Sequence, residues 1–167
     1  LERFLQWHAA DRGRELVATE HDFTVKLDVG GTDVLLRGSM DRVELDGDGR
    51  VHVVDLKTAK SLPSKKELEK HPQLGTYQLA VQEGAVEGHT EAGGAELVML
   101  RLDGEAGAKV ADQVALPTGP TWLTELLATA VGRVVQETFP PTPSDACDRC
   151  AFRRCCPAQP DGRQVVE

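Results

Sequence analysis

The sequence contains few aromatic residues and no long hydrophobic run. Phe, Trp and Tyr make up 4% of its 167 residues, whereas 40% of the residues are hydrophobic. A core must therefore be built mainly from Leu, Val and Ala, which suits a single domain of the α/β class. No run approaches the roughly 18 apolar residues that a membrane-spanning helix needs, and the first residues lack the order of a secretion signal. We therefore expect a cytoplasmic protein with no membrane partner.

An excess of positive charge is also lacking, because 27 Asp and Glu residues oppose 19 Lys and Arg residues, for a formal net charge of −8. This balance argues against a domain that holds nucleic acid on a broad basic surface, since such binding depends on Lys and Arg displacing counterions from phosphates. It does not exclude a nuclease, because a carboxylate site becomes electropositive once a divalent cation is bound. From the charge alone, an ordinary acidic surface is the simpler interpretation.

Cysteine is absent before position 147, and all four cysteines lie in the segment CDRCAFRRCC. Disulfides are disfavoured in the cytosol, so metal binding is the first interpretation of this cluster. Cys147 and Cys150 bring two thiolates to one centre through a short loop, and Cys156 offers a third. An iron-sulfur cluster and a zinc ion are both compatible with such ligands, and a segment that binds no metal is the remaining alternative.

The chain begins at Leu1 rather than at Met, inside a segment with helical periodicity. Leu1, Phe4, Leu5 and His8 recur at helical spacing, and the pattern stops at Gly13. We expect a short helix here, and we expect the chain to be a piece of a larger protein.

Three extended segments follow and predict a meander. Residues 16–27 and 33–45 are separated by DVGGTD, and DGDG at 46–49 precedes a β-branched segment at 50–58. The pattern then predicts a helix over 67–83 with Pro72 near a first turn, a buried strand over 93–102 and a helix over 121–139. The order β-β-β-α-β-α predicts an α/β fold with a central mixed β-sheet flanked by helices. We place the core domain at residues 1–140 and a cysteine-rich segment with a tail at residues 141–167.

Two carboxylates and a lysine are predicted to meet on this sheet. Asp41 and Asp55 are about equally distant from the DGDG turn, so they can be neighbours across two strands. Side chains alternate along a strand, so Asp55 and Lys57 share one face while Leu56 points into the opposite layer. Two adjacent acids resist ionisation unless a cation lies between them, and hard oxygen ligands suit Mg²⁺ or Mn²⁺. The simpler alternative is an Asp-Asp-Lys charge set on the surface of a hairpin.

The residues around these three positions strengthen the prediction of a site. The strings GSMDRVE, VVDLKT and QLGTY occur in this order, the last beginning at Gln73. Together they resemble the PD-(D/E)XK nuclease superfamily, and in particular its RecB-like branch, which carries G-x-x-D-R, an apolar strand ending in D-x-K-T, and a helix with Q-x-x-x-Y. The resemblance covers residues 15–157 and implies a restriction-endonuclease-like fold. It also implies that Asp41 and Asp55 are metal ligands, that the main-chain carbonyl of Leu56 is a further ligand, and that Lys57 is the catalytic lysine.

Five further residues are candidates for the same site. Gln73 and Tyr77 lie one helical turn apart and would hold DNA or a ligand carboxylate, with an ordinary amphipathic helix face as the alternative. The family also uses a histidine on a helix before the strands. His8 is on a helix but lacks the expected glycine-led context, and we expect the counterpart upstream of this sequence. Glu20 and His21 could reach the metal from the first strand, although a solvated strand edge is the simpler interpretation.

The cysteine segment resembles the C-terminal part of the iron-sulfur motif of AddB-type nucleases. It has the form C-x2-C-x-aromatic-x3-C with Phe152 as the aromatic residue, and the resemblance implies a 4Fe-4S cluster with Cys147, Cys150 and Cys156 as ligands. In that family the fourth ligand lies far upstream, before the nuclease strands. Here the fourth ligand either precedes the present sequence or is replaced by Cys155. The cluster would be structural, joining the two ends of the domain.

The combined pattern favours a metal-dependent deoxyribonuclease, acting as an exonuclease, in a helicase-nuclease that processes double-strand breaks for recombination repair. The run HPQLGTYQLAVQEGA and the composition resemble the C-terminal nuclease domain of actinobacterial UvrD/REP-type helicases. The expected partners are DNA, as a single strand or a duplex end, the ATP-binding helicase domains of the same polypeptide, and a second helicase-nuclease subunit. The alternatives are a catalytically silent DNA-contact module of the same fold and an α/β domain whose zinc knuckle makes protein contacts.

Overall fold

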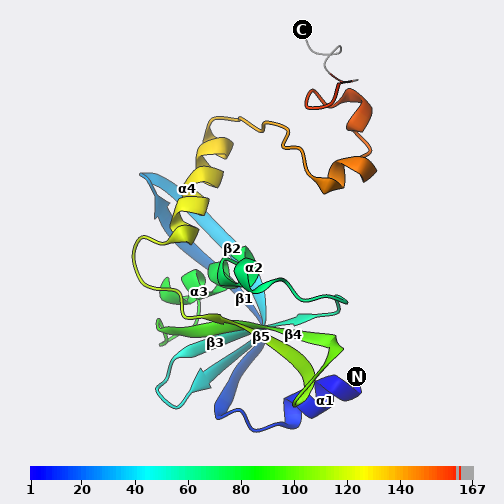
Figure 1. Ribbon diagram of the computed structural model, residues 1–167. Coiled ribbons are helices and arrows are strands. Elements are labelled where there is room, and N and C mark those ends of the chain that lie inside the picture. The colour runs from blue at the N-terminus through cyan, green and yellow to red at the C-terminus, as the bar shows by residue number, and fades with distance from the viewer. Residues whose placement is uncertain (161, 163–167) are drawn as a thin grey trace. The chain divides into compact units, whose positions relative to one another are not determined.

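A five-stranded mixed sheet forms the centre of the first of two compact units. The computed structural model describes residues 1–160 and 162, and the chain divides into Leu1–Thr129 and Ala130–Glu167. The strand order is β1-β2-β3-β4-β5 (Figure 1). The strands are β1 (Arg14–Val29), β2 (Thr32–Asp46), β3 (Val51–Lys57), β4 (Ala92–Gly104) and β5 (Gly107–Val114). β3 and β4 pair in parallel, and the other neighbouring strands pair antiparallel.

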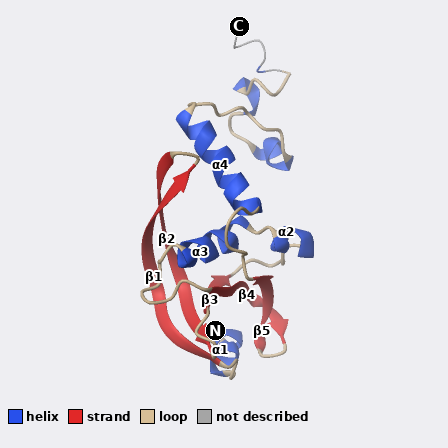
Figure 2. Ribbon diagram, turned by 90° about the vertical axis from the view of Figure 1, so that its left-hand side faces the viewer, coloured by secondary structure: helices blue, strands red, loops and turns tan. Residues whose placement is uncertain are grey.

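Helices cover both faces of this sheet. α1 (Glu2–Ala9) lies on one side, and α2 (Lys65–Glu69) and α3 (Pro72–Gln82) lie on the other (Figure 2). α4 (Trp122–Val135) runs from the first unit into the second, which also contains the short 3-10 helices η1 (Asp145–Arg149) and η2 (Arg153–Cys155). In the part of the chain that the structure describes, no helix is long and apolar enough to cross a membrane.

The structure confirms the predicted α/β class with its mixed sheet and corrects two elements. Residues 67–83 form two helices rather than one, because Pro72 disfavours a helical conformation at the preceding residue and instead opens α3 with His71 as N-cap. The prediction also omitted β5. This edge strand buries only Ala108 and Gln113, so its sequence shows no continuous apolar alternation. The observed order after α1 is therefore β-β-β-α-α-β-β-α.

The main core lies between the sheet and α3. Val43, Val53 and Leu97 from three adjacent strands pack with Leu74 and Val81 of the helix. Residues 94–99 of β4 are buried throughout, as the continuous apolar run predicted. Each fully buried aliphatic side chain contributes roughly 1.5–3 kcal/mol, so this cluster is the main source of stability for the first unit.

A smaller core and a buried ion cluster lie under α1, on the opposite face. Trp7, Val54 and Val98 form the centre of this core. Beside it lie five charged residues, which we call the back-face ion cluster: Arg12, Arg14, Arg42, Glu44 and Glu96. Glu44 is 0% exposed and pairs with Arg12 and Arg42, whose guanidinium carbons lie 4.1 and 5.5 Å from the centre of the Trp7 ring. Arg12 also donates to the main-chain carbonyl of Trp7 at 2.7 Å, so the cluster links the end of α1 to Glu44 of β2.

The hairpin of β1 and β2 changes its inward face in the middle. Ala18 and Phe23 both pack in the main core, although strict alternation would place residues five apart on opposite faces. The change occurs at Glu20, whose φ of 47° lies in the left-handed region. Glu20 lies opposite Asp41, and the residues on either side of these two are paired across the strands. A non-glycine residue in this region is uncommon and strained. Residues 21–40, which we call the arm, therefore alternate in a different phase from the strand ends that carry the site.

Candidate active site

The pairing of β2 with β3 brings Asp41 next to Asp55. Arg42 lies opposite Val54 in this antiparallel pair, so Asp41 and Asp55 are the next residues along the hairpin. Asp41 Oδ2 accepts a hydrogen bond of 2.7 Å from the main-chain N–H of Leu56, which fixes the carboxylate beside β3. The Leu56 side chain packs against the smaller core on the other face, as alternation predicted.

Three side chains surround the carboxylate of Asp55, which is 3% exposed. Lys57 Nζ lies 2.6 Å from Asp55 Oδ2, while Gln73 Nε2 and Tyr77 Oη donate to Asp55 Oδ1 at 2.8 and 3.3 Å. Gln73 also links its neighbours, because its Oε1 accepts from Lys57 Nζ at 3.0 Å and its Nε2 lies 2.8 Å from Tyr77 Oη. The structure thus brings together the five side chains that the sequence had singled out from β2, β3 and α3.

The electrostatics of the site disfavour the charged form of Asp55. Burial raises the pKa of Asp55 above its usual range, with a further increase from Asp41 and an opposing decrease from Lys57. Burial also raises the pKa of Tyr77, so its phenol is protonated at neutral pH and can donate. Two carboxylates against one ammonium leave a surplus of negative charge that a cation would neutralise.

The donors of this site fit a hard divalent cation. Asp55 Oδ2 is buried and receives no well-directed hydrogen bond, although Lys57 Nζ lies close to it. Carboxylate and carbonyl oxygens, here from Asp41, Asp55 and the main chain at Leu56, are the ligands that Mg²⁺ and Mn²⁺ prefer. No group of three or more His, Cys, Asp or Glu side chains within residues 1–160 and 162 is arranged to hold a metal ion. A metal here would therefore rely on two carboxylates together with main-chain and water oxygens.

A contact between Gly38 and Phe23 explains the glycine of the G-x-x-D-R string. A Cβ atom at Gly38 would lie 2.8 Å from the Phe23 ring, so only glycine leaves room for that ring. Phe23 in turn packs edge-on against Tyr77, with ring centres 6.4 Å apart. Gly38 thereby supports Tyr77, which donates to Asp55. Sequence reasoning could not find this pairing, because Phe23 belongs to the facing strand.

His71 is a second residue near the site that sequence reasoning missed. It is the N-cap of α3, and its Nδ1 accepts from the main-chain N–H of Leu74 at 3.5 Å. Burial lowers the pKa of His71, while Asp55 acts in the opposite direction. The available signal was its position directly before Pro72, where an N-cap is expected.

The three weaker candidates have other contacts. His8 Nδ1 lies 3.1 Å from Arg42 Nη1 and its ring stacks on Phe4, so it belongs to the back face under α1. His21 Nε2 lies 2.7 Å from the carbonyl oxygen of Ala85. Glu20 is exposed at the point where β1 changes its inward face.

The four cysteines are free thiols in the second unit. Cys150 and Cys155 are exposed, and the Cys155 thiol donates to the carbonyl of Phe152 at 3.3 Å. Cys147 Sγ accepts from the main-chain N–H of Ser144 at 3.3 Å. Among the described residues, no three of these thiols are gathered at one point as a cluster would require.

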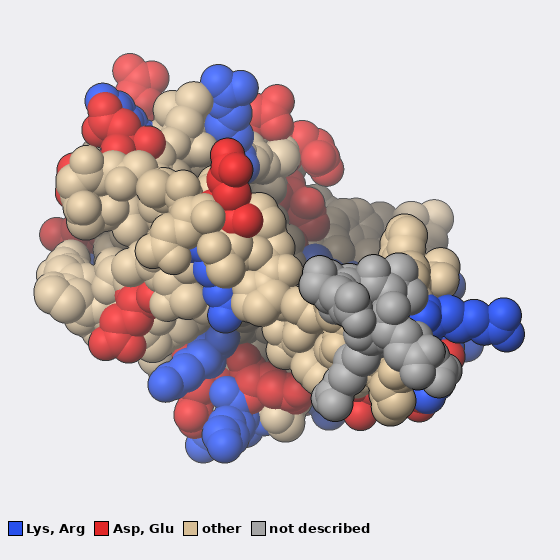
Figure 3. Space-filling model, turned by 90° about the horizontal axis from the view of Figure 1, so that it is seen from above, with Lys and Arg blue, Asp and Glu red and all other residues tan. Residues whose placement is uncertain are grey.

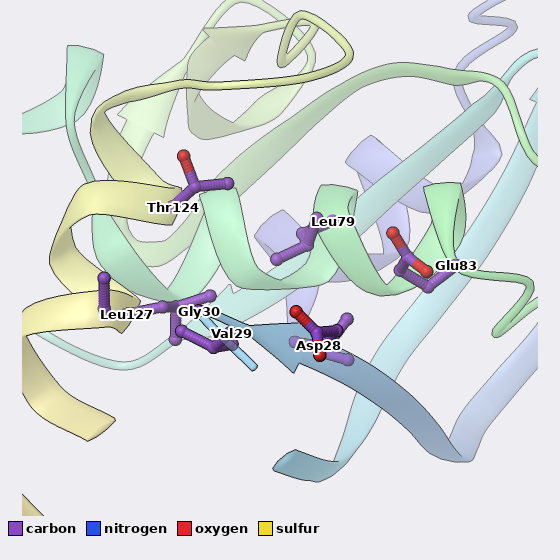
Figure 4. A pocket seen from close by; sticks show the side chains of 9 residues that line it. Asp28, Val29, Gly30, Leu79, Glu83, Thr124 and Leu127 are labelled. Carbon is purple, nitrogen blue, oxygen red and sulfur yellow. The ribbon is translucent and has the colours of Figure 1, made fainter. Parts of the chain in front are cut away.

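A cavity of about 220 Å³ lies away from these residues, between the arm, α3 and the start of α4. Figure 4 shows Asp28, Val29 and Gly30 on the hairpin side of this cavity, with Leu79 and Glu83 of α3 beside them. None of the five site residues lines it. On the face seen in Figure 3, acidic and basic side chains are interspersed, with no continuous basic surface.

Comparison with known proteins agrees with this geometry. The chain matches the PD-(D/E)XK nuclease superfamily over residues 1–157, and it belongs to that superfamily, whose members are mostly metal-dependent nucleases. Its fold is similar to a solved structure described as the crystal structure of SSO0001, with 18% sequence identity and a TM-score of 0.55. The alignment covers 85% of this chain and 60% of that one. No curated protein matches the chain.

Proposed function

We propose that this chain is a Mg²⁺- or Mn²⁺-dependent deoxyribonuclease that hydrolyses phosphodiester bonds at Asp41 and Asp55. The observation that carries the proposal is the convergence of these two carboxylates with Lys57, whose Nζ lies 2.6 Å from Asp55 Oδ2. Asp41, Asp55 and the carbonyl of Leu56 would hold the metal. When bound, the metal would acidify a water molecule and polarise the phosphate.

The remaining side chains have distinct roles in this proposal. Lys57 is one-third exposed, and its ammonium is oriented by Gln73, so it can neutralise charge that develops on the phosphate. Gln73 and Tyr77 both donate to the carboxylate of Asp55. These contacts favour a role in positioning Asp55 over direct contact with DNA.

The finer features of the proposal follow the resemblance of the sequence. They are exonuclease action on a DNA single strand or duplex end, a cytoplasmic location, and a place in a RecB-like helicase-nuclease that repairs double-strand breaks by recombination. The 4Fe-4S cluster with Cys147, Cys150 and Cys156 as ligands stays a prediction for the intact protein. No step of the proposed reaction uses the cluster.

The test is cleavage of end-labelled single-stranded and double-stranded DNA in Mg²⁺, Mn²⁺ or EDTA. Asp55→Asn removes one charge from the site, and Asp48→Asn removes the same charge from the exposed turn between the same two strands. We expect EDTA and Asp55→Asn each to abolish cutting, whereas Asp48→Asn should cut like the parent.

The products and the negative outcomes discriminate between the remaining functions. Stepwise shortening from one end indicates an exonuclease, and internal products indicate an endonuclease. Binding of DNA without cutting, unchanged by Asp55→Asn, would favour the silent DNA-contact module. Tight zinc at the cysteines with no dependence on Mg²⁺ would favour the protein-contact domain.

A further inference from the structure

Lysine is concentrated in one short part of an otherwise acidic chain. Of the seven lysines in the sequence, four lie in residues 60–70, which we call the lysine segment: Lys60, Lys65, Lys66 and Lys70. The segment also has two glutamates, so its formal charge is +2, and the chain total of −8 leaves −10 on the other residues. A polyanion would therefore meet attraction at this segment and repulsion over much of the remaining surface.

The four ammonium groups have no ionic partner among residues 1–160 and 162. All four lysines are exposed, and none of them forms an ion pair with any residue in 1–160 or with residue 162. Glu67 of the same segment accepts hydrogen bonds from Ser64 in the capping box of α2. Lys65 and Lys66 are the first two residues of α2, a helix of only five residues. The four side chains are therefore free to contact a ligand outside the chain.

The lysine segment is fastened beside the proposed active site. Lys57 precedes it and Gln73 follows it, and these two side chains are joined by a hydrogen bond of 3.0 Å. Gln113 of β5, which is 5% exposed, donates to the carbonyls of Leu68 and His71 at 2.8 and 3.3 Å. α2 and α3 lie on the same side of the sheet (Figure 2). The main chain around α2, which carries Lys65, Lys66 and Lys70, is thus held against β5.

We propose that the lysine segment binds the phosphates of a nucleic-acid strand on one side of the bond to be cut. The inference rests on the proposed function, and it adds the path that the strand takes, over α2. Each lysine that contacts a phosphate releases a counterion, which makes the negative slope of log K against log salt steeper by about 0.7 for a single strand. These contacts are equal in the ground state and the transition state, so they determine KM rather than kcat.

The experiment compares two double variants that change the net charge equally. Lys65→Gln/Lys66→Gln alters the lysine segment, and Lys26→Gln/Lys109→Gln alters two lysines outside it. Binding of a fluorescent single-stranded oligonucleotide is measured in EDTA between about 50 and 200 mM salt, the range over which such contacts are resolved. Cleavage kinetics in Mg²⁺ and a thermal melt are recorded for each protein.

We expect the segment variant to bind roughly tenfold or more weakly than the parent near 100 mM salt, with a slope of log K against log salt that is shallower by about 1.4. Its KM should be raised and its kcat unchanged. Its melting temperature should be unchanged, because neither lysine forms an ion pair among the described residues. The control variant should bind almost like the parent.

Four outcomes would overturn the inference, and they are distinguishable from one another. Equal losses of affinity in both variants would show that only the net charge matters. If the parent cuts DNA and the segment variant binds DNA with the same affinity and KM as the parent, the role of the lysine segment is refuted while the proposed function stands. A parent that neither binds nor cuts DNA would remove the proposed function together with this inference. Binding of the parent to phosphatidylserine vesicles in preference to the oligonucleotide, lost in the segment variant, would reassign the lysines to a membrane.

Discussion

Glu44 of the back-face ion cluster is the residue whose replacement should destabilise the first unit most clearly through electrostatics. Its carboxylate is 0% exposed and is shared by Arg12 and Arg42, with Arg14 Nη1 3.7 Å from its second oxygen. Glu44→Gln keeps the shape of the side chain but removes the charge that these guanidinium groups share. The partly buried arginines would then have only one carboxylate beside them, that of Glu96, where the parent has two.

The expected loss is about 3 kcal/mol in the free energy of unfolding. Removal of one partner from a buried ion pair costs about 3–5 kcal/mol, because the other charge stays buried. The lower end applies here, since the Arg12 and Arg14 side chains are 18% and 21% exposed and can regain some hydration. A loss of this size is a large part of the roughly 5–15 kcal/mol that stabilises a domain.

Urea unfolding followed by circular dichroism measures this loss. With a denaturant slope of about 1–3 kcal/mol per molar, the midpoint should fall by roughly 1–3 M. Asp103→Asn is the control, because it removes an exposed ion pair with Arg3, and Asp103 is 85% exposed. We expect no measurable shift for it. A loss below about 1 kcal/mol for Glu44→Gln, the size expected of a surface pair, would refute the view that this cluster is a buried electrostatic unit.

Three further predictions concern the site. In EDTA, Asp55→Asn should have a higher melting temperature than the parent at neutral pH. Because the pKa of Asp55 is raised in the folded protein, the parent loses stability as the pH rises from 3.8 through that pKa. The two melting temperatures should therefore converge in acid. Mg²⁺ at a hundred times its Kd should stabilise the parent by about 2.7 kcal/mol, and Asp41→Asn should abolish this gain in a melting titration. Gly38→Ala should displace the Phe23 ring, lower the free energy of unfolding in urea by about 1–3 kcal/mol and lower the cleavage rate. Gly47→Ala is the control: no atom lies within 4 Å of its Cβ position, so neither quantity should change.

The part of the site that could be predicted from the sequence depends on local spacing. Equal distances from one turn placed Asp41 beside Asp55, and the helical spacing of Gln73 and Tyr77 placed both on one face of α3. The same alternation that predicted these positions also predicted that Leu56 would pack in the opposite layer.

The features that were missed depend on contacts between distant residues. Charged residues that alternate along a strand resemble a solvated face, so nothing local shows that Glu44 is buried among arginines. The kink at Glu20 has no glycine to mark its positive φ. Gln113 is buried only because the chain at α2 lies against β5.

The change of face at Glu20 separates two parts of one hairpin that obey different requirements. The strand ends carry Asp41 on one face and Arg42 on the other, so a shift of one residue there would exchange the face of the proposed site with that of the ion cluster. The arm beyond the kink has its own phase and ends in a glycine turn at Gly30 and Gly31. Paired insertions or deletions at that turn would therefore lengthen or shorten the arm while the end of the hairpin that carries Asp41 keeps its register.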